Sequence, residues 1–301
     1  MAEDTAVGAA TPALLEASDD LYDGKIVNPA ALPSDPAAFR ARLAASLAAW
    51  RAGGVHGVWL RLGLAQSPLV PVAAEEGFVF HHAEKDYVMM TQWLPTDLPC
   101  TLPPNASHQV GVGAFVVDGQ GRVLVVQERS GVLRGRGVWK MPTGLVSSGE
   151  DLTEAAEREL REETGVEARV EAVLAVRQMH GAAFGKSDLF VVLGMRPTAE
   201  GQEPVPCERE LVAAAWLPLT GYTDQAFFAG MPLYQTLLER CQAWAEGRYS
   251  GMRAERLESS ITRKRHDLLV WGVDDAELGR AREALGGVEA GAKPAEPGEG
   301  A

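Results

Sequence analysis

The chain has 301 residues, of which 46% are hydrophobic, enough for two modest domains with cores of their own. Its net charge of −13 argues against binding to a nucleic-acid backbone, which needs a basic surface. No run of about 18 apolar residues is present in the sequence, so we expect no membrane span. The three cysteines have neither paired nor metal-ligand spacing and indicate free thiols in a reducing compartment.

The chain begins with an acidic segment. Residues 1–24 contain six acidic side chains and neither lysine nor arginine, a composition that opposes a secretory signal or an organellar transit peptide. We therefore expect a flexible acidic lead over residues 1–24 and a cytoplasmic location.

A small α/β domain is expected over residues 25–100. Apolar residues recur at helical spacing from Phe39 to Trp50, and a Gly-Gly pair follows that can end the helix. The elements predicted here are a helix from Pro36, strands over 55–62, 77–82 and 87–93, and a short helix over 68–76.

A second and larger α/β domain is expected over residues 105–272. Residues 273–301 are dominated by Ala, Gly, Glu and Pro, which predicts a disordered tail. The elements predicted in the second domain are strands over 110–117, 122–127, 170–177 and 189–195, a helix after residue 151, a strand before Trp216 and a late amphipathic helix marked by Leu233, Leu237, Cys241 and Trp244.

One stretch of the second domain carries the candidate chemistry. It follows the spacing G-x5-E-x7-R-E-U-x-E-E-x-G-U, in which U is apolar. The positions are filled by Gly144, Glu150, Arg158, Glu159, Leu160, Glu162, Glu163, Gly165 and Val166.

The stretch also has the start and stop signals of a helix. Asp151 and Glu154 match a capping box, and Gly165 is the expected left-handed residue at the C-terminal end. Glu150 and Arg158 are expected to form an ion pair that orients the loop and the start of the helix.

The positions of the acids on this helix predict a metal site. At about 100° per residue, Glu163 falls within the apolar stripe, Glu159 lies at its edge and Glu162 lies just beyond. Carboxylates beside a buried stripe repel one another and lose hydration unless a cation joins them. Oxygen ligands of this kind favour Mg²⁺ or Mn²⁺. The alternative, a solvated acidic face, suits Glu154 and Glu157.

The spacing resembles the Nudix box, the signature of hydrolases that cleave a diphosphate linked to another moiety. The resemblance covers about residues 25–272 and includes GVWLRL, VWKMPTGLV and RQMHGAAFGKSDLFVV. These stretches are similar to a eukaryotic subgroup with plant hydrolases active on ADP-ribose and NADH and the animal fibroblast growth factor antisense protein. The resemblance implies a Nudix α/β/α sandwich with a mixed sheet, preceded by a small α/β N-terminal domain.

The resemblance also implies a reaction in which water attacks one phosphorus of a diphosphate. It implies that Glu159, Glu162, Glu163 and the backbone carbonyl of Gly144 hold Mg²⁺ or Mn²⁺. Such a cation neutralises charge on phosphate oxygens and lowers the pKa of bound water.

The reaction also needs a general base, for which the resemblance implies two choices, and cations that contact the phosphates. The general base is Glu159 or a glutamate on a later loop, Glu208 or Glu210, of which Glu210 is better placed because it directly precedes a predicted strand. Arg129 and Lys186 are candidate cations for the phosphates, with surface solvation as the alternative for each.

The function predicted from the sequence is therefore Mg²⁺-dependent hydrolysis of ADP-ribose, NADH or a related nucleotide diphosphate. One alternative is a dinucleoside polyphosphate or mRNA-cap hydrolase, against which the acidic composition weighs. The other is a non-catalytic nucleotide-binding regulatory module, against which the intact box weighs. The partner expected is a small nucleotide. The sequence does not set the oligomeric state and leaves a homodimer open, since enzymes that resemble this chain are often dimers.

Overall fold

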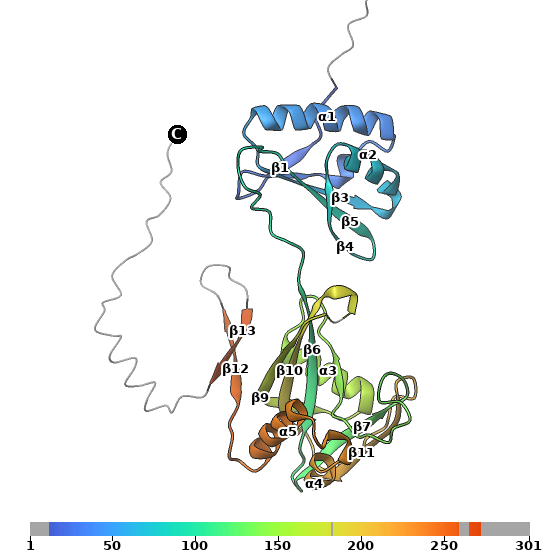
Figure 1. Ribbon diagram of the computed structural model, residues 1–301, viewed down its shortest axis with the longest axis vertical. Coiled ribbons are helices and arrows are strands. Elements are labelled where there is room, and N and C mark those ends of the chain that lie inside the picture. The colour runs from blue at the N-terminus through green and yellow to red at the C-terminus, as the bar shows by residue number, and fades with distance from the viewer. Residues whose placement is uncertain (1–11, 182, 259–264, 272–301) are drawn as a thin grey trace, which may run out of the picture. The chain divides into compact units, whose positions relative to one another are not determined.

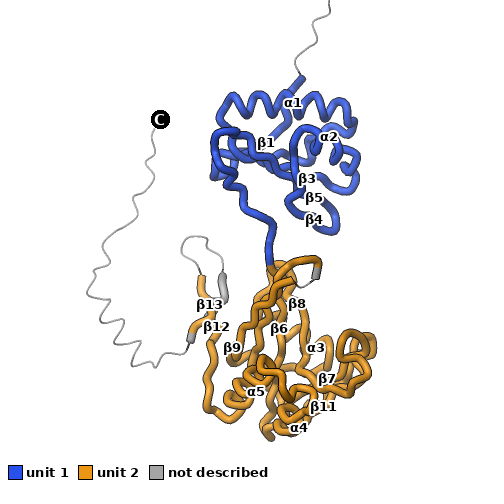
Figure 2. Tube along the Cα trace, viewed as in Figure 1, with its two compact units in different colours: residues 1–107 blue, residues 108–301 orange. Residues whose placement is uncertain are grey.

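The computed structural model describes residues 12–181, 183–258 and 265–271. The chain divides into two compact units, residues 1–107 and 108–301 (Figure 2). The disordered tail predicted over residues 273–301 lies outside the described residues. None of the described helices combines the length and the apolar character needed to cross a membrane.

Unit 1 is a mixed five-stranded sheet with helices packed on its core face. Strand β3 pairs in parallel with β2 and antiparallel with β5. The core joins Leu43 and Leu47 of the first helix to Leu60 of the sheet. The sheet has the order β1 (Ala17–Asp19), β2 (Lys25–Val27), β3 (Gly57–Gly63), β5 (Tyr87–Trp93), β4 (Val79–Ala83), and the helices are η1 (Pro29–Ala31), α1 (Pro36–Ala52), η2 (Leu64–Leu69) and α2 (Val70–Glu75).

The second half of the predicted lead is part of this sheet. Strand β1 pairs with β2, and the Asp20 carboxylate accepts the backbone N–H of Gly24 at 2.7 Å in the turn between them. Leu15 is buried, and its N–H donates to Ser46 Oγ at 2.7 Å. The expectation of a flexible lead over residues 1–24 is therefore wrong for the part that the structure describes. The prediction from the acidic composition overlooked one buried apolar residue, Leu15, and one turn-forming residue, Asp20.

Unit 2 contains a mixed six-stranded sheet and a separate two-stranded ribbon. Strand β10 pairs in parallel with β6 and antiparallel with β9. The larger sheet has the order β13 (Arg265–Trp271), β12 (Met252–Glu258), β9 (Ala168–Met179), β10 (Ser187–Pro197), β6 (His108–Val116), β8 (Thr143–Leu145), and the ribbon joins β7 (Arg122–Glu128) to β11 (Leu211–Pro218).

Helices pack on both faces of the larger sheet (Figure 1). Successive residues of β10 point to opposite faces, so Val191 joins the core beneath Leu160 and Val192 joins the core beneath Trp244. The three-layer arrangement with a mixed sheet confirms the predicted fold class. The helices of unit 2 are α3 (Leu152–Thr164), η3 (Ala183–Gly185), α4 (Leu219–Thr223), η4 (Ala226–Phe228) and α5 (Pro232–Ala245).

The β12–β13 hairpin is an addition to the predicted elements. Within the described residues, β12 is registered with β9 at one pair, Met252 and Val173. The sequence gives no sustained alternation here, because Arg256 stands where an apolar residue would continue the pattern of Met252 and Ala254.

Close packing between β10 and α5 makes Gly194 a sensitive position. A Cβ at Gly194 would lie 2.8 Å from the indole of Trp244. We expect Gly194→Ala to lower the free energy of unfolding by about 1–3 kcal/mol, because the indole has to shift within a packed core. Gly221→Ala is the control, since its Cβ would lie 3.8 Å from the nearest atom, Pro218 Cδ. Equal denaturant midpoints for the two variants would contradict this packing.

Candidate active site

The helix α3 forms where the start and stop signals predict it. Glu154 Oε2 accepts the backbone N–H of Asp151 at 3.5 Å, the N-terminal half of the capping arrangement. Gly165 has the left-handed φ of 70° and donates its N–H to the Arg161 carbonyl at 2.9 Å. Leu160 is fully buried against the sheet. These contacts fix which acids of the helix face inward.

Glu163 is a buried carboxylate and only 6% exposed. Its Oε2 has no hydrogen-bond partner among the described residues. Burial is the main cause that raises the pKa of Glu163 to about 7, and the negative charges of Glu159 and Glu210 raise it further. The positive charge of Lys140 and a hydrogen bond from the Thr143 backbone lower it. Residues from three separate segments therefore surround one carboxylate.

Gly144 lies directly against Glu159. A Cβ at this position would come within 1.9 Å of Glu159 Cδ, so no larger residue fits while the glutamate keeps its place. Gly144 belongs to β8 and pairs with Val112 of β6. The sheet thus sets the predicted backbone ligand beside a predicted side-chain ligand.

Arg158 connects the acids at the outer edge of the helix. Its Nε and Nη2 donate to the two oxygens of Glu150 at 2.6 and 2.8 Å, which confirms the expected ion pair. Its Nη1 donates to Glu159 at 2.8 Å and to Glu162 at 3.3 Å. The bond from Arg158 lowers the pKa of Glu150, and the same bond raises that of Arg158. The guanidinium holds the loop before the helix onto the helix.

The turn before β11 brings Glu210 to the same region. The Cys207 N–H donates to the Glu163 carbonyl at 2.8 Å, which ties this turn to the end of α3. The Glu210 side chain is exposed. The backbone N–H of Arg129 donates to the Glu210 carbonyl at 2.8 Å, and Arg129 Nη2 donates to the Leu211 carbonyl at 3.1 Å. Arg129 thereby braces the turn that carries Glu210.

Lys186 lies on a different segment from those around Glu163. It is half-buried in the connection between β9 and β10. The cation that faces Glu163 is Lys140, whose Nζ is 2.7 Å from both Glu128 Oε1 and Thr143 Oγ1. Backbone pairing with Val126 of β7 places it there. Sequence reasoning missed Lys140, for which the only signal is its position just ahead of the box.

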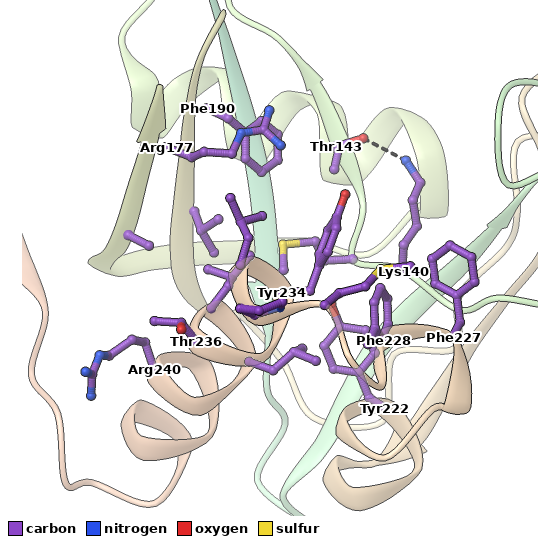
Figure 3. Close-up of a pocket in the computed structure, with 18 of the residues that line it drawn as sticks. Lys140, Thr143, Arg177, Phe190, Tyr222, Phe227, Phe228, Tyr234, Thr236 and Arg240 are labelled. Atoms are coloured by element: carbon purple, nitrogen blue, oxygen red, sulfur yellow. Dashed lines mark hydrogen bonds between the residues drawn. The ribbon is translucent and has the colours of Figure 1, made fainter. Parts of the chain in front are cut away.

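A cavity of about 810 Å³ opens beside this group. Lys140 and Thr143, which act on Glu163, also line the cavity, and Arg177 and Phe190 form another part of its wall (Figure 3). The remaining walls are mainly apolar and aromatic, with the rings of Tyr222, Phe227, Phe228 and Tyr234.

The oxygen donors of this region suit a divalent cation. A buried carboxylate oxygen, Glu163 Oε2, has no hydrogen-bond partner among the described residues, and the charges of Glu159 and Glu210 act on the same carboxylate. Carboxylate oxygens are the donors that Mg²⁺ and Mn²⁺ prefer. Glu159 and Glu162 are both paired with Arg158. Within the described part of the chain, no three His, Cys, Asp or Glu side chains form a ready-made ligand group.

Comparison with known proteins identifies the family. The NUDIX domain family matches residues 107–235, and the Nudix hydrolase domain family matches residues 15–94. Nudix hydrolase 8 of Arabidopsis thaliana is 45% identical over 262 residues, which cover 87% of this chain and 70% of the relative. The chain belongs to the Nudix hydrolase family.

The resemblance to plant and animal members is confirmed as well. The human protein named Nucleoside diphosphate-linked moiety X motif 6 is 40% identical over 188 residues, which cover 62% of this chain and 58% of the relative. A solved NUDIX hydrolase structure from Nitrosomonas europaea is 22% identical, covers 47% of this chain and 92% of its own, and has a TM-score of 0.36.

The raised pKa of Glu163 makes the stability of the metal-free protein depend on pH. Between the ordinary carboxyl value of 4.5 and about 7, folded Glu163 keeps a proton that the unfolded chain has lost. The free energy of unfolding therefore falls as the pH rises through this window. The variant Glu163→Gln cannot titrate at this position. Relative to it, the free energy of unfolding of the wild type should fall by on the order of 3 kcal/mol between pH 4.5 and pH 8.

Denaturant unfolding in the presence of a chelator at a series of pH values measures this difference. Glu162→Gln is the control, because its side chain is 58% exposed on the same helix. Its stability should follow the wild-type pH dependence. Parallel curves for the wild type and Glu163→Gln would show that Glu163 is not the buried titrating group.

Proposed function

We propose that the chain is a Mg²⁺-dependent hydrolase of nucleoside diphosphate derivatives, with ADP-ribose and NADH as its leading substrates. The observation that carries the proposal is the buried carboxylate of Glu163, on which the charges of Glu159 and Glu210 act. Lys140 and Thr143, which also act on this carboxylate, line a cavity of about 810 Å³. A charge in this position needs a cation, and the neighbouring cavity has room for an organic substrate.

In this proposal Glu159, Glu162, Glu163 and the Gly144 carbonyl hold the metal. Mg²⁺, or Mn²⁺ in its place, supplies charge neutralisation at the phosphate oxygens and lowers the pKa of a bound water. Lys140 supplies a further positive charge where the cavity meets the acids. It is better placed for the phosphates than Arg129, whose Nη2 is bonded to the Leu211 carbonyl, or Lys186, which lies on the β9–β10 connection.

We assign the general base to Glu210 in preference to Glu159. The Glu159 carboxylate is paired with Arg158 and lies against Gly144, which suits a metal ligand. The Glu210 side chain is exposed, and the backbone bonds of Cys207 and Arg129 position its turn next to Glu163. A carboxylate that is near the metal ligands yet open to water suits removal of a proton from the attacking water.

The proposed substrate class draws on the relatives. The human relative is named for a nucleoside diphosphate linked to a moiety X. The preference for ADP-ribose and NADH follows from the resemblance over most of the chain to the plant hydrolases of this subgroup. The aromatic cavity supports a substrate that carries a flat ring.

Product analysis tests the proposed reaction. ADP-ribose should yield AMP and ribose 5-phosphate in the presence of Mg²⁺, and no product should form with a chelator. A panel with NADH, dinucleoside polyphosphates and a capped RNA fragment separates the alternatives. Faster turnover of the last two would replace the proposed substrates, and nucleotide binding without turnover of any compound would indicate a regulatory module.

The assignment of the base predicts distinct effects of two glutamates. Glu210→Gln should lower kcat by about 10²–10⁴-fold while the Mg²⁺ concentration for half-maximal rate stays the same, because only proton transfer is impaired. Glu159→Gln should raise that Mg²⁺ concentration as well. Glu208→Gln is the control from the same exposed turn. If Glu210→Gln keeps a kcat within about twofold of the control, Glu210 is not the base.

A further inference from the structure

The ring of Phe190 packs against two glycines, Gly111 and Gly113, which together are called the glycine seat. Gly111 and Gly113 alternate along β6, and both point toward Phe190 of the paired strand β10. A Cβ at Gly111 would lie 3.2 Å from the ring, and one at Gly113 would lie 2.8 Å from it. Any side chain at either position would displace the ring, so the glycines let it lie flat against the strand.

The guanidinium of Arg177 lies over this ring. Its central carbon is 5.0 Å from the centroid of Phe190, and Nη2 is paired with Asp188 Oδ2 at 2.5 Å. The Arg177 side chain is 31% exposed. The Phe190 ring and the guanidinium over it thus lie together at the cavity wall (Figure 3). The ion pair with Asp188 holds the guanidinium in this position.

The arrangement is not explained by stability alone. Arg177 Nε is buried and has no hydrogen-bond partner among the described residues, whereas a buried donor is ordinarily paired. Arg177 lines the cavity and its side chain is partly exposed, so its planar guanidinium is accessible to a ligand there. Planar cations of this kind stack on aromatic rings.

The position of this surface fits one end of a nucleotide. Lys140 and Thr143 line the same cavity and adjoin Glu163, where the proposed function places the diphosphate. The apolar walls, such as Val192 and Ala175, are unsuited to phosphate and suited to a heterocyclic ring.

We propose that Arg177, held by Asp188 and backed by Phe190, is the stacking platform for the flat heterocyclic ring of the substrate. The ring is a nucleobase or the nicotinamide of a dinucleotide. Arg177 thereby determines specificity, and Asp188 is a positioning residue. The placement of the diphosphate rests on the proposed function, whereas binding of the ring rests on the geometry of the cavity wall.

Calorimetric binding to the metal-free full-length chain tests the platform without any turnover. AMP and ribose 5-phosphate share a phosphate and a ribose, and AMP carries adenine where ribose 5-phosphate has its anomeric hydroxyl. The wild type should bind AMP at least about tenfold more tightly, a ratio typical of one stacked base. Arg177→Met should reduce the ratio to about threefold or less, because the planar surface is gone.

Two variants separate stacking from charge and from general damage. Arg177→Lys keeps the charge and loses the plane, so its ratio should fall as it does in Arg177→Met. Arg240→Met, from a second arginine that lines the cavity, should keep the wild-type ratio. Thermal melting establishes which variants fold, and if Arg177→Met does not, Arg177→Lys and Asp188→Asn carry the test.

The possible results decide between the proposals. A wild-type chain that does not distinguish AMP from ribose 5-phosphate, or an Arg177→Lys variant with the wild-type ratio, would overturn the stacking platform. A chain that loses the ratio in both Arg177 variants but hydrolyses no nucleotide would retain the platform and refute the proposed function.

Discussion

The candidate site of unit 2 depends on one constraint, the burial of the Glu163 carboxylate with one oxygen that has no hydrogen-bond partner among the described residues. The period of α3 carries Glu163 into the interface with the sheet, where burial raises its pKa to about 7. Helix geometry could have turned this position outward only by exposing the apolar stripe that contains Leu160. The fold therefore buries a carboxylate whose charge is not fully compensated, and a bound cation is the chemically simplest way to compensate it.

The sheet links this requirement to the cavity. The acids lie with α3 on one side of the sheet, whereas the cavity is lined by residues of α5, β9 and β10. The segment from Lys140 to Thr143 takes part in both, since it acts on Glu163 and lines the cavity. A substrate with a charged diphosphate and a flat ring needs two such environments in contact. This combination supports the proposed reaction more strongly than the acidic motif does by itself.

Short-range signals made the box helix predictable and left its surroundings unpredictable. The capping pair and Gly165 defined the ends of α3, and the angle per residue oriented Glu163 correctly. The approach of Lys140 depends on strand pairing with Val126, which has no local signature. The same is true of the glycine seat for Phe190, which needs the parallel register of β6 and β10. Strand β1 was missed because it has three residues, is flanked by Glu16 and Asp20, and has its apolar anchor, Leu15, outside the strand.

The central claim is that the carboxylates of α3 hold a divalent cation, and calorimetric titration of the full-length chain with Mg²⁺ alone, at pH 8, tests it most directly. The wild type should bind Mg²⁺, and Glu163→Gln should bind it at least about tenfold more weakly, because one ligand charge is lost. Glu157→Gln, from the same helix but paired with Arg169, should bind like the wild type. Equal Mg²⁺ affinities for the wild type and Glu163→Gln would contradict the account.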